Sequence, residues 1–159
     1  MKELLELLEK DHTLTTDQLA VMLGMSKESV AAEIERLEQE KIIVKYHTII
    51  NWEKAGVESV YAIIHVNIAP QREVGFDAIA ERIYRFPEVK NLYLMSGTFD
   101  LSVMVECQSL KEISQFVFSK LATIEGVVST NTHFLLKRYK AEGVIMEDEE
   151  EDRRLAVTP

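Results

Sequence analysis

Hydrophobic positions in the first forty residues recur at helical spacing and predict three helices. Apolar residues between positions 4 and 8 indicate a first helix that ends near Lys10. Thr15 or Thr16 can cap a second helix, which Gly24 ends because glycine adopts a left-handed conformation without a Cβ clash. Ser26 can cap a third helix that runs to Gln39. The expected buried residues of the last two helices are Leu19, Ala20, Met22, Leu23, Val30, Ile34 and Leu37, with Ala31 alongside.

A short helix, a glycine turn and a longer capped helix are typical of a helix-turn-helix. Two β-rich runs follow it, at 42–44 and 46–50, and predict a small wing or a strand that leads out of the domain. We therefore expect a winged helix-turn-helix domain over residues 1–50 and a linker over residues 51–58.

The second half of the chain contains two consecutive strand–helix–strand units, separated by about 38 residues by direct count along the chain. The pattern predicts strands over 60–68, 89–95, 101–107 and 127–136, and helices over 77–86 and 110–122. Two such units predict a ferredoxin-like βαββαβ sandwich over residues 59–141, so the fold class is α+β. Both faces of the first strand are apolar, so we expect the uncovered sheet face to pack on a second copy in a homodimer.

The chain has a formal net charge of −9, and its acidity is concentrated at the two ends. Residues 1–50 hold six basic and ten acidic residues, whereas residues 142–159 hold two and seven. An acidic domain is unusual for a DNA-binding protein, because affinity for DNA generally depends on neutralising phosphates. The segment 142–159 is expected to be an acidic tail, either solvated or adding Leu155–Val157 as an edge strand to a neighbouring sheet.

The sequence contains no apolar run long enough to cross a membrane and no signal-peptide pattern at its N-terminus. A single cysteine, Cys107, excludes an internal disulfide and a multi-cysteine metal site, and we expect it to be an inert packing residue. These features predict a cytoplasmic protein without a membrane partner.

Several segments, taken in order and at their spacings, resemble the Lrp/AsnC (leucine-responsive, or feast/famine) family of transcriptional regulators. They are the helix-turn-helix residues 19–26, the third helix and its exit at 34–43, the connecting run 46–51, and the turn Ser96-Gly97-Thr98-Phe99-Asp100. The turn resembles the family's Gly-x-x-Asp motif. The resemblance implies double-stranded DNA and a small effector, such as an amino acid, as partners. It also implies dimers that assemble into octamers, with the effector bound between dimers.

In this interpretation the third helix enters the major groove of DNA with its first turns facing the bases. The candidate DNA-binding residues are Ser26, Lys27, Glu28, Ser29, Glu33, Arg36, Lys41 and Lys45. Glutamates outnumber basic residues on this helix, and glutamate can accept a hydrogen bond from cytosine but adds no phosphate affinity. The alternative is a helix-turn-helix that contacts only proteins. If the domain binds DNA, we expect modest affinity from each copy, recovered by several copies on repeated half-sites.

The turn 96–100 is the candidate effector site. Gly97 is expected to allow a turn with positive φ and to leave backbone N–H groups open to an α-carboxylate, while Asp100 can pair with an α-ammonium. The alternative is a purely structural turn, with Asp100 bonded to its own backbone. The candidate effector-binding residues are Met95, Ser96, Gly97, Thr98 and Asp100, with Thr130 and Thr132 if these reach the turn of a neighbouring subunit.

The four histidines have no close metal-ligand spacing, so we expect no metal and no cofactor. His65 and His133 lie on predicted strands and are interpreted as possible neighbours with a structural or interface role.

Two other functions compete with a regulator gated by a small molecule. Certain haem-pathway decarboxylases resemble the same two-domain architecture, but such an enzyme needs His and Arg to converge on one pocket. Here Arg72, Arg82 and Arg85 lie on or before the first helix of the second domain, away from His65 and His133. We therefore expect no enzyme activity. The second alternative is a DNA-architectural or scaffold protein that needs no effector.

Overall fold

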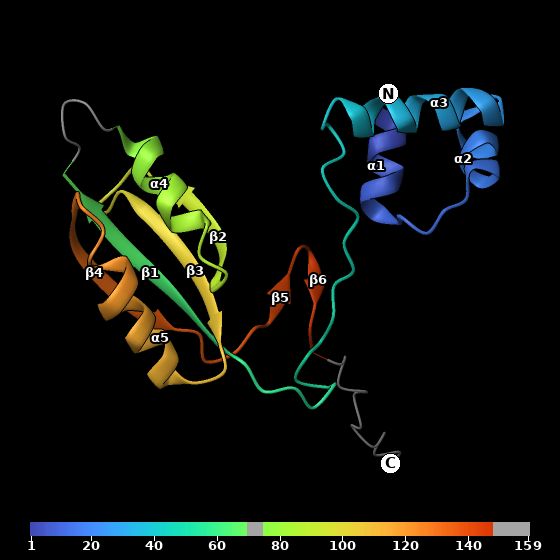
Figure 1. Cartoon of the computed structure of the whole chain (residues 1–159). Coiled ribbons are helices and arrows are strands. Elements are labelled where there is room, and N and C mark those ends of the chain that lie inside the picture. The colour runs from blue at the N-terminus through green and yellow to red at the C-terminus, as the bar shows by residue number, and fades with distance from the viewer. Residues whose placement is uncertain (70–74, 148–159) are drawn as a thin grey trace, which may run out of the picture. The chain divides into compact units, whose positions relative to one another are not determined.

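The computed structural model describes residues 1–69 and 75–147, and the chain divides into two compact units, Met1–Ile49 and a second that begins at Ile50 (Figure 1). The first unit consists of α1 (Lys2–Lys10), α2 (Thr16–Leu23) and α3 (Lys27–Gln39). Its core consists of one buried stripe from each helix: Leu4, Leu8, Leu19, Val30 and Leu37. The predicted helix-turn-helix is confirmed. Met22, expected in the core, is 59% exposed, because the face centred on Leu19 turns towards Ala20 and Leu23 instead.

The strands expected over 42–44 and 46–50 are absent from the structure. Ile42 and Ile43 form the turn that closes the end of α3, since both of their N–H groups donate to the carbonyl of Leu37, at 2.9 and 3.0 Å. The chain beyond them has no pairing partner among the described residues of its protomer, and β-propensity alone does not make a strand without a neighbour to share its hydrogen bonds. A single protomer therefore presents a helix-turn-helix without a wing.

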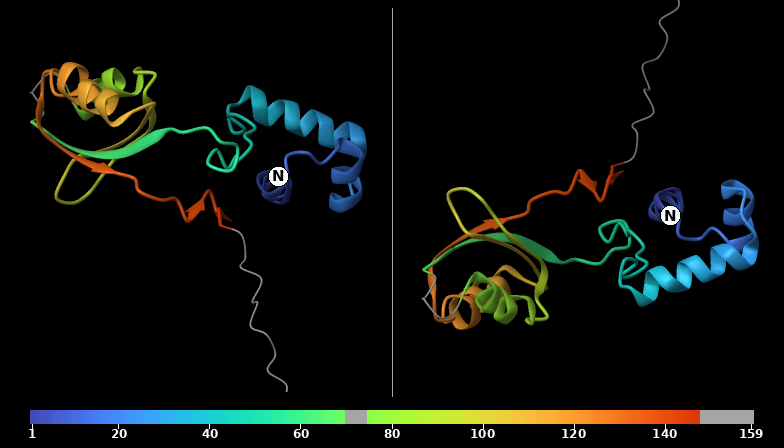
Figure 2. Two further views of the ribbon diagram at one scale, coloured as in Figure 1. Left: turned by 90° about the horizontal axis from the view of Figure 1, so that it is seen from below. Right: turned by 90° about the horizontal axis from the view of Figure 1, so that it is seen from above.

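The second unit is an antiparallel sheet covered on one face by helices. Its elements are β1 (Val60–Ile68), α4 (Phe76–Tyr84), β2 (Val89–Leu94), β3 (Leu101–Cys107), α5 (Leu110–Phe116), η1 (Val117–Leu121) and β4 (Val127–Phe134). The strand order β2-β3-β1-β4 confirms the predicted ferredoxin-like sandwich. Figure 2 shows both helices on one side of the sheet and the β2–β3 loop projecting from the other side.

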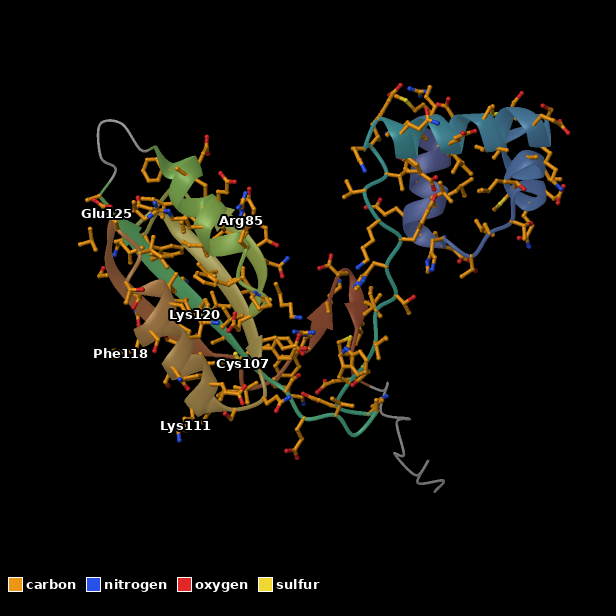
Figure 3. The ribbon with its side chains drawn as sticks, viewed as in Figure 1. Arg85, Cys107, Lys111, Phe118, Lys120 and Glu125 are labelled. Carbon is orange, nitrogen blue, oxygen red and sulfur yellow. The ribbon has the colours of Figure 1, made fainter. Side chains whose placement is uncertain are left out.

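The core of this unit lies between the sheet and the helices. Alternate residues of β1 and β3 point into this core, among them Ile64, Val66 and Val103, and their side chains are at most 7% exposed. From the helices, Ile79, Ile83, Ile113 and Phe116 complete this layer. The predicted helix 110–122 changes after Phe116 into the π-helical segment η1, which carries Phe118 outwards, 82% exposed (Figure 3).

A short hairpin that the sequence analysis missed follows the sandwich. Its strands are β5 (Lys140–Ala141) and β6 (Val144–Ile145). Glu142 and Gly143 connect them with φ values of 47° and 82°, which is the pattern of a type I′ turn. The expected acidic tail therefore does not begin at residue 142. The part of that tail from 148 to 159, including the alternative edge strand Leu155–Val157, lies outside the described residues.

Candidate DNA-binding and effector-binding sites

Local hydrogen bonds fix the turn between α2 and α3. Thr15 and Gln18 form a reciprocal capping box at the start of α2, and Gly24 ends that helix with φ of 63°. The hydroxyl of Ser26 then accepts the N–H of Ser29 at 3.2 Å and caps α3. The expected roles of Gly24 and Ser26 are therefore confirmed. They leave the N-terminal turn of α3 exposed, including Lys27 and Glu28.

Both basic side chains of α3 are already engaged in ion pairs. Lys27 Nζ lies 2.8 Å from Asp17 Oδ2 on α2, and this hydrogen bond raises the pKa of Lys27. Arg36 bridges Glu33 and Glu40 at 2.8 and 2.7 Å, and its hydrogen bond lowers the pKa of Glu33. A contact with a DNA phosphate therefore has to compete with these carboxylates.

The exposed face of α3 carries short alanine side chains and acidic glutamate side chains. Glu28, Ala31, Ala32 and Glu35 are all exposed, and among the described residues no ion pair or hydrogen bond engages the Glu28 carboxylate. Beyond the helix, Lys41 and Lys45 are exposed without an ion-pair partner in the described part of the chain. The predicted DNA-binding residues thus separate into a group at the start of and along α3 and two exposed lysines after it, without ion-pair partners in the described residues.

Tyr46, to which the sequence analysis gave no role in this site, anchors the chain that carries these lysines. Its hydroxyl donates to Glu38 Oε1 at 2.9 Å, and its ring lies 6.2 Å from the ring of His12, stacked at 27°. Burial and the bond to Glu38 raise the pKa of Tyr46. The spacing of eight residues between Glu38 and Tyr46 carries no motif that would have revealed this contact.

In the second unit, Asp100 closes the turn between β2 and β3 and ties it to β1. The N–H of Ile68 donates to Asp100 Oδ2 at 2.7 Å, and the N–H of Asp100 donates to the carbonyl of Val66 at 3.0 Å. The carbonyl of Asp100 accepts the N–H of Met95 at 2.8 Å. One carboxylate oxygen is thus used structurally, while Oδ1 has no partner in the described residues.

Gly97 does not adopt the positive φ expected from the sequence. A Cβ built on Gly97 would meet no atom within 4 Å, so neither backbone strain nor packing in the protomer requires glycine there. The expected left-handed turn is therefore wrong, because the six-residue loop reverses the chain without it. Met95, Ser96, Gly97 and Thr98 are all exposed, which leaves this stretch of backbone accessible.

The structure does not bring Thr130 and Thr132 together with the turn in one protomer. They lie opposite Val66 and Ile64 in the β1–β4 register, and therefore share the sheet face that the helices cover. The turn instead folds over the open face, where Phe99 stacks on His65 with ring centroids 3.7 Å apart. The expectation that His65 and His133 are neighbours in the sheet is confirmed, at 4.6 Å between centroids.

Side chains of opposite ends of the second unit line a cavity of about 540 Å³ that the sequence analysis did not anticipate. Trp52 and Tyr61 supply aromatic walls, and the guanidinium of Arg138 lies 4.5 Å from the centre of the Tyr61 ring. Asn51 Nδ2 donates to the carbonyl of Met146 at 2.9 Å and joins the start of the unit to the end of the hairpin. Only the tertiary structure brings these segments together, so no local signal could have found the cavity.

Two arginines of the second unit lie away from the histidines. Arg82 and Arg85 lie in and directly after the last turn of α4, on the helical layer, where Figure 3 labels Arg85. His65 and His133 lie on the open face of the sheet. Arg72 lies outside the described residues. Burial raises the pKa of the Cys107 thiol, which disfavours a reactive thiolate. No helix in the described residues is long and apolar enough to cross a membrane.

Comparison with known proteins places these features in a family. Residues 61–145 match the Lrp/AsnC ligand-binding domain. An uncharacterised helix-turn-helix transcriptional regulator of Bacillus subtilis, YugG, is 45% identical over 99% of this chain and 95% of its own length. A regulator of Pyrococcus horikoshii, PH0140, also uncharacterised, is 31% identical over 84% of this chain and 82% of its own.

Solved structures share the fold. A feast or famine regulatory protein from M. tuberculosis, complexed with L-methionine, superposes with a TM-score of 0.72 at 22% identity, covering 91% of this chain and 95% of that one. A transcriptional regulator from Neisseria meningitidis in complex with L-methionine gives 0.70 at 22% identity, over 87% and 88% of the two chains.

Proposed function

Because the chain belongs to the Lrp/AsnC family of transcriptional regulators, we propose that it binds DNA sequence-specifically and that a small effector, an amino acid, modulates its assembly or its DNA affinity. The observation that carries the DNA-binding half is the capped α3 helix, whose N-terminal turn is exposed next to the α2 turn. The names of the relatives support a regulator rather than an enzyme.

The proposed DNA contacts divide by role. Residues on the first turns of α3 read base edges: Ser26, Lys27, Glu28, Ser29 and Glu33. Arg36, Lys41 and Lys45 contact the phosphate backbone, with Arg36 exchanging a carboxylate partner for a phosphate. Since few cations are free, each domain binds weakly, and a homodimer that assembles to an octamer engages several half-sites at once.

The proposed effector site is the turn 95–100. Its exposed N–H groups bind the α-carboxylate of an amino acid, and the free Oδ1 of Asp100 binds the α-ammonium. Thr130 and Thr132 lie on the other face of the sheet, so a contribution from them comes from a neighbouring subunit. Two relatives of this fold are described as complexes with L-methionine, which supports an amino acid as the ligand class.

An effector-independent DNA-architectural protein is the second candidate, and one observation favours it. The bond from Ile68 to Asp100 closes the turn with contacts of the protomer itself, as in a purely structural turn. An effector acts only through a difference in affinity between two assemblies, so a rigid turn that is identical in both would not respond.

Selection of random duplexes by the purified protein tests the DNA-binding half. We expect a reproducible sequence motif, and a change in base preference at one position for Glu28→Ala, because Glu28 is exposed and unbonded. Glu9→Ala removes the same charge from α1 and serves as the control, with no change in motif. Recovery of duplexes without any common sequence would contradict the proposal.

Asp100→Asn tests the effector half without disturbing the turn. Asparagine keeps an oxygen that can accept the Ile68 N–H but removes the negative charge that binds an α-ammonium. We expect retained DNA binding and stability, with loss of the response to amino acids. Asp100→Ala removes both the acceptor for the Ile68 N–H and the negative charge, and is expected to lower stability by about 1–2 kcal/mol. An undiminished response in Asp100→Asn would contradict the assigned site.

A further inference from the structure

Two histidines lie side by side on the open face of the sheet in the second unit. The β1–β4 register places His133 opposite Ile63 and His65 opposite Asn131, so both imidazoles project from the face that the helices leave uncovered. Their ring centroids are 4.6 Å apart and the rings are inclined at 51°. The strand pairing thus brings together two groups that are 68 residues apart in the sequence.

The ring nitrogens of both histidines are unoccupied within the part of the chain that the structure describes. The contacts of His65 and His133 there are with aromatic rings, and neither side chain forms a hydrogen bond or an ion pair. Phe99 stacks on one face of the His65 ring at an interplanar angle of 6°, which restrains the ring. A restrained imidazole pair loses less entropy when it binds a ligand.

We propose that His65 and His133 form half of a binding site for a divalent transition-metal ion of the Zn²⁺ type, completed by the same two histidines of a second copy. Imidazole nitrogen lies about 2.0–2.1 Å from bound zinc, which puts the centroids of two imidazoles on one ion roughly 4.5–5.5 Å apart for ligand angles of about 90–120°. The observed separation of 4.6 Å lies at the lower end of this range, so a small opening of the pair brings it to the tetrahedral angle. Imidazole suits zinc, copper and nickel and does not suit calcium or magnesium.

The protomer's described residues do not complete the coordination of such an ion. No group of three or more His, Cys, Asp or Glu side chains among them could hold a metal. Asn67 and Ser129, on the same face, are hydrogen-bonded to each other at 3.0 Å, and the carboxylate of Glu106 is engaged by Tyr61 and Lys90. Because structural zinc sites have four ligands, two more imidazoles have to come from another copy of this face.

Zinc titration of the full chain after treatment with EDTA, followed by calorimetry and by elemental analysis, tests this assignment. We expect one Zn²⁺ ion per two chains, and an affinity at least about 100-fold lower in His65→Gln and in His133→Gln. His47→Gln replaces an exposed histidine of the first unit and is expected to bind zinc as the unchanged protein does. One ion per chain, or equal affinity in all three variants, would overturn the proposal.

The completed site rests on the dimer of the proposed function but not on its DNA or effector chemistry. DNA binding and the response to amino acids are therefore measured in parallel with EDTA present. If the unchanged protein binds no zinc but shows both of those activities, the metal site alone is overturned. Thermal unfolding of each glutamine variant is recorded, and a variant that melts with the unchanged protein has lost its ligands rather than its fold.

Discussion

At the scale of single residues, the backbone φ and the space around Cβ show at which positions the structure requires glycine. Gly126 has φ of 94°, and a Cβ there would lie 2.6 Å from Ile79 Cδ1 on α4. Gly97 has neither a positive φ nor a close neighbour. Lys41 is the opposite case, since a lysine occupies a left-handed position with φ of 59°. These three positions predict different responses to substitution.

Gly126→Ala is expected to destabilise the second unit by about 1–3 kcal/mol, because the methyl group meets Ile79 and the backbone is strained. Gly97→Ala is the matched control, with an expected change within about 0.5–1 kcal/mol in either direction. Urea unfolding followed by circular dichroism measures both. Equal stability of Gly126→Ala and Gly97→Ala would contradict this account of the two glycines.

Lys41→Gly is expected to stabilise the first unit by about 0.5–1 kcal/mol. Lys41 occupies the left-handed position after α3, where its N–H donates to the carbonyl of Glu38 and that of Ile42 to Leu37, and glycine adopts this conformation without a Cβ clash. Lys41→Ala removes the same charge but keeps the strain, and in urea unfolding it should gain nothing. Equal midpoints for the two variants would show that charge and not conformation decides the stability.

At the scale of elements, α3 is distinguished by cations that are already paired with carboxylates of the first unit. Arg36 is shared between Glu33 and Glu40, and Lys27 is paired with Asp17, in side chains that are 25–67% exposed. Exposed pairs of this kind contribute little to stability and are screened by salt. Their larger consequence is for DNA binding, since each pair withholds a charge from the phosphates.

Glu40→Gln is expected to tighten DNA binding about 3–10-fold at low salt, because it releases Arg36 from one carboxylate and removes one repulsive charge. The logarithm of affinity against the logarithm of salt concentration should become steeper by up to about 1 per domain. Glu9→Gln makes the same change of charge on α1. Fluorescence anisotropy that gives Glu9→Gln the same gain would assign the effect to net charge alone.

Most elements could be predicted because each carries its own local pattern. Alternation in β1 and β3 and the caps of α2 and α3 depend on neighbours within one or two turns, so the sequence reveals them. The prediction of a wing was wrong because a strand needs a neighbouring strand to share its backbone hydrogen bonds. The β5–β6 hairpin was missed because Glu142 lacks the usual residue preference for a positive φ. The π-helical segment η1 was predicted as α-helix because its apolar spacing is the same as that of an α-helix.

The candidate effector site was predictable only in its location. The Gly-x-x-Asp resemblance located the turn, but the bond from Ile68 to Asp100 depends on which strand lies beside the turn. The faces of Thr130 and Thr132 depend on register, and the mainly polar run of β4 does not reveal it. Register also creates the His65–His133 pair, which sequence spacing could not establish.

At the scale of the whole molecule, the second unit presents an open sheet face next to the turn 95–100, and the first unit presents α3, whose two cations are both held in ion pairs. Both features favour an assembly of several copies. In such an assembly another copy can bury the open sheet face. Several weakly binding domains also bind DNA more tightly together, because each raises the effective concentration of the next. In the proposed mechanism, an amino acid that binds one assembly better than another changes which half-sites are engaged, with a typical coupling of about 1–3 kcal/mol.

The molar mass of the protein by size-exclusion chromatography with light scattering, with and without a pool of the twenty amino acids, tests this central claim most directly. The account predicts a mass above that of one 18.2 kDa chain in both conditions, and a change between assemblies when one amino acid of the pool is present. A mass that stays constant across every amino acid would contradict control of assembly by an effector, and would favour the architectural alternative.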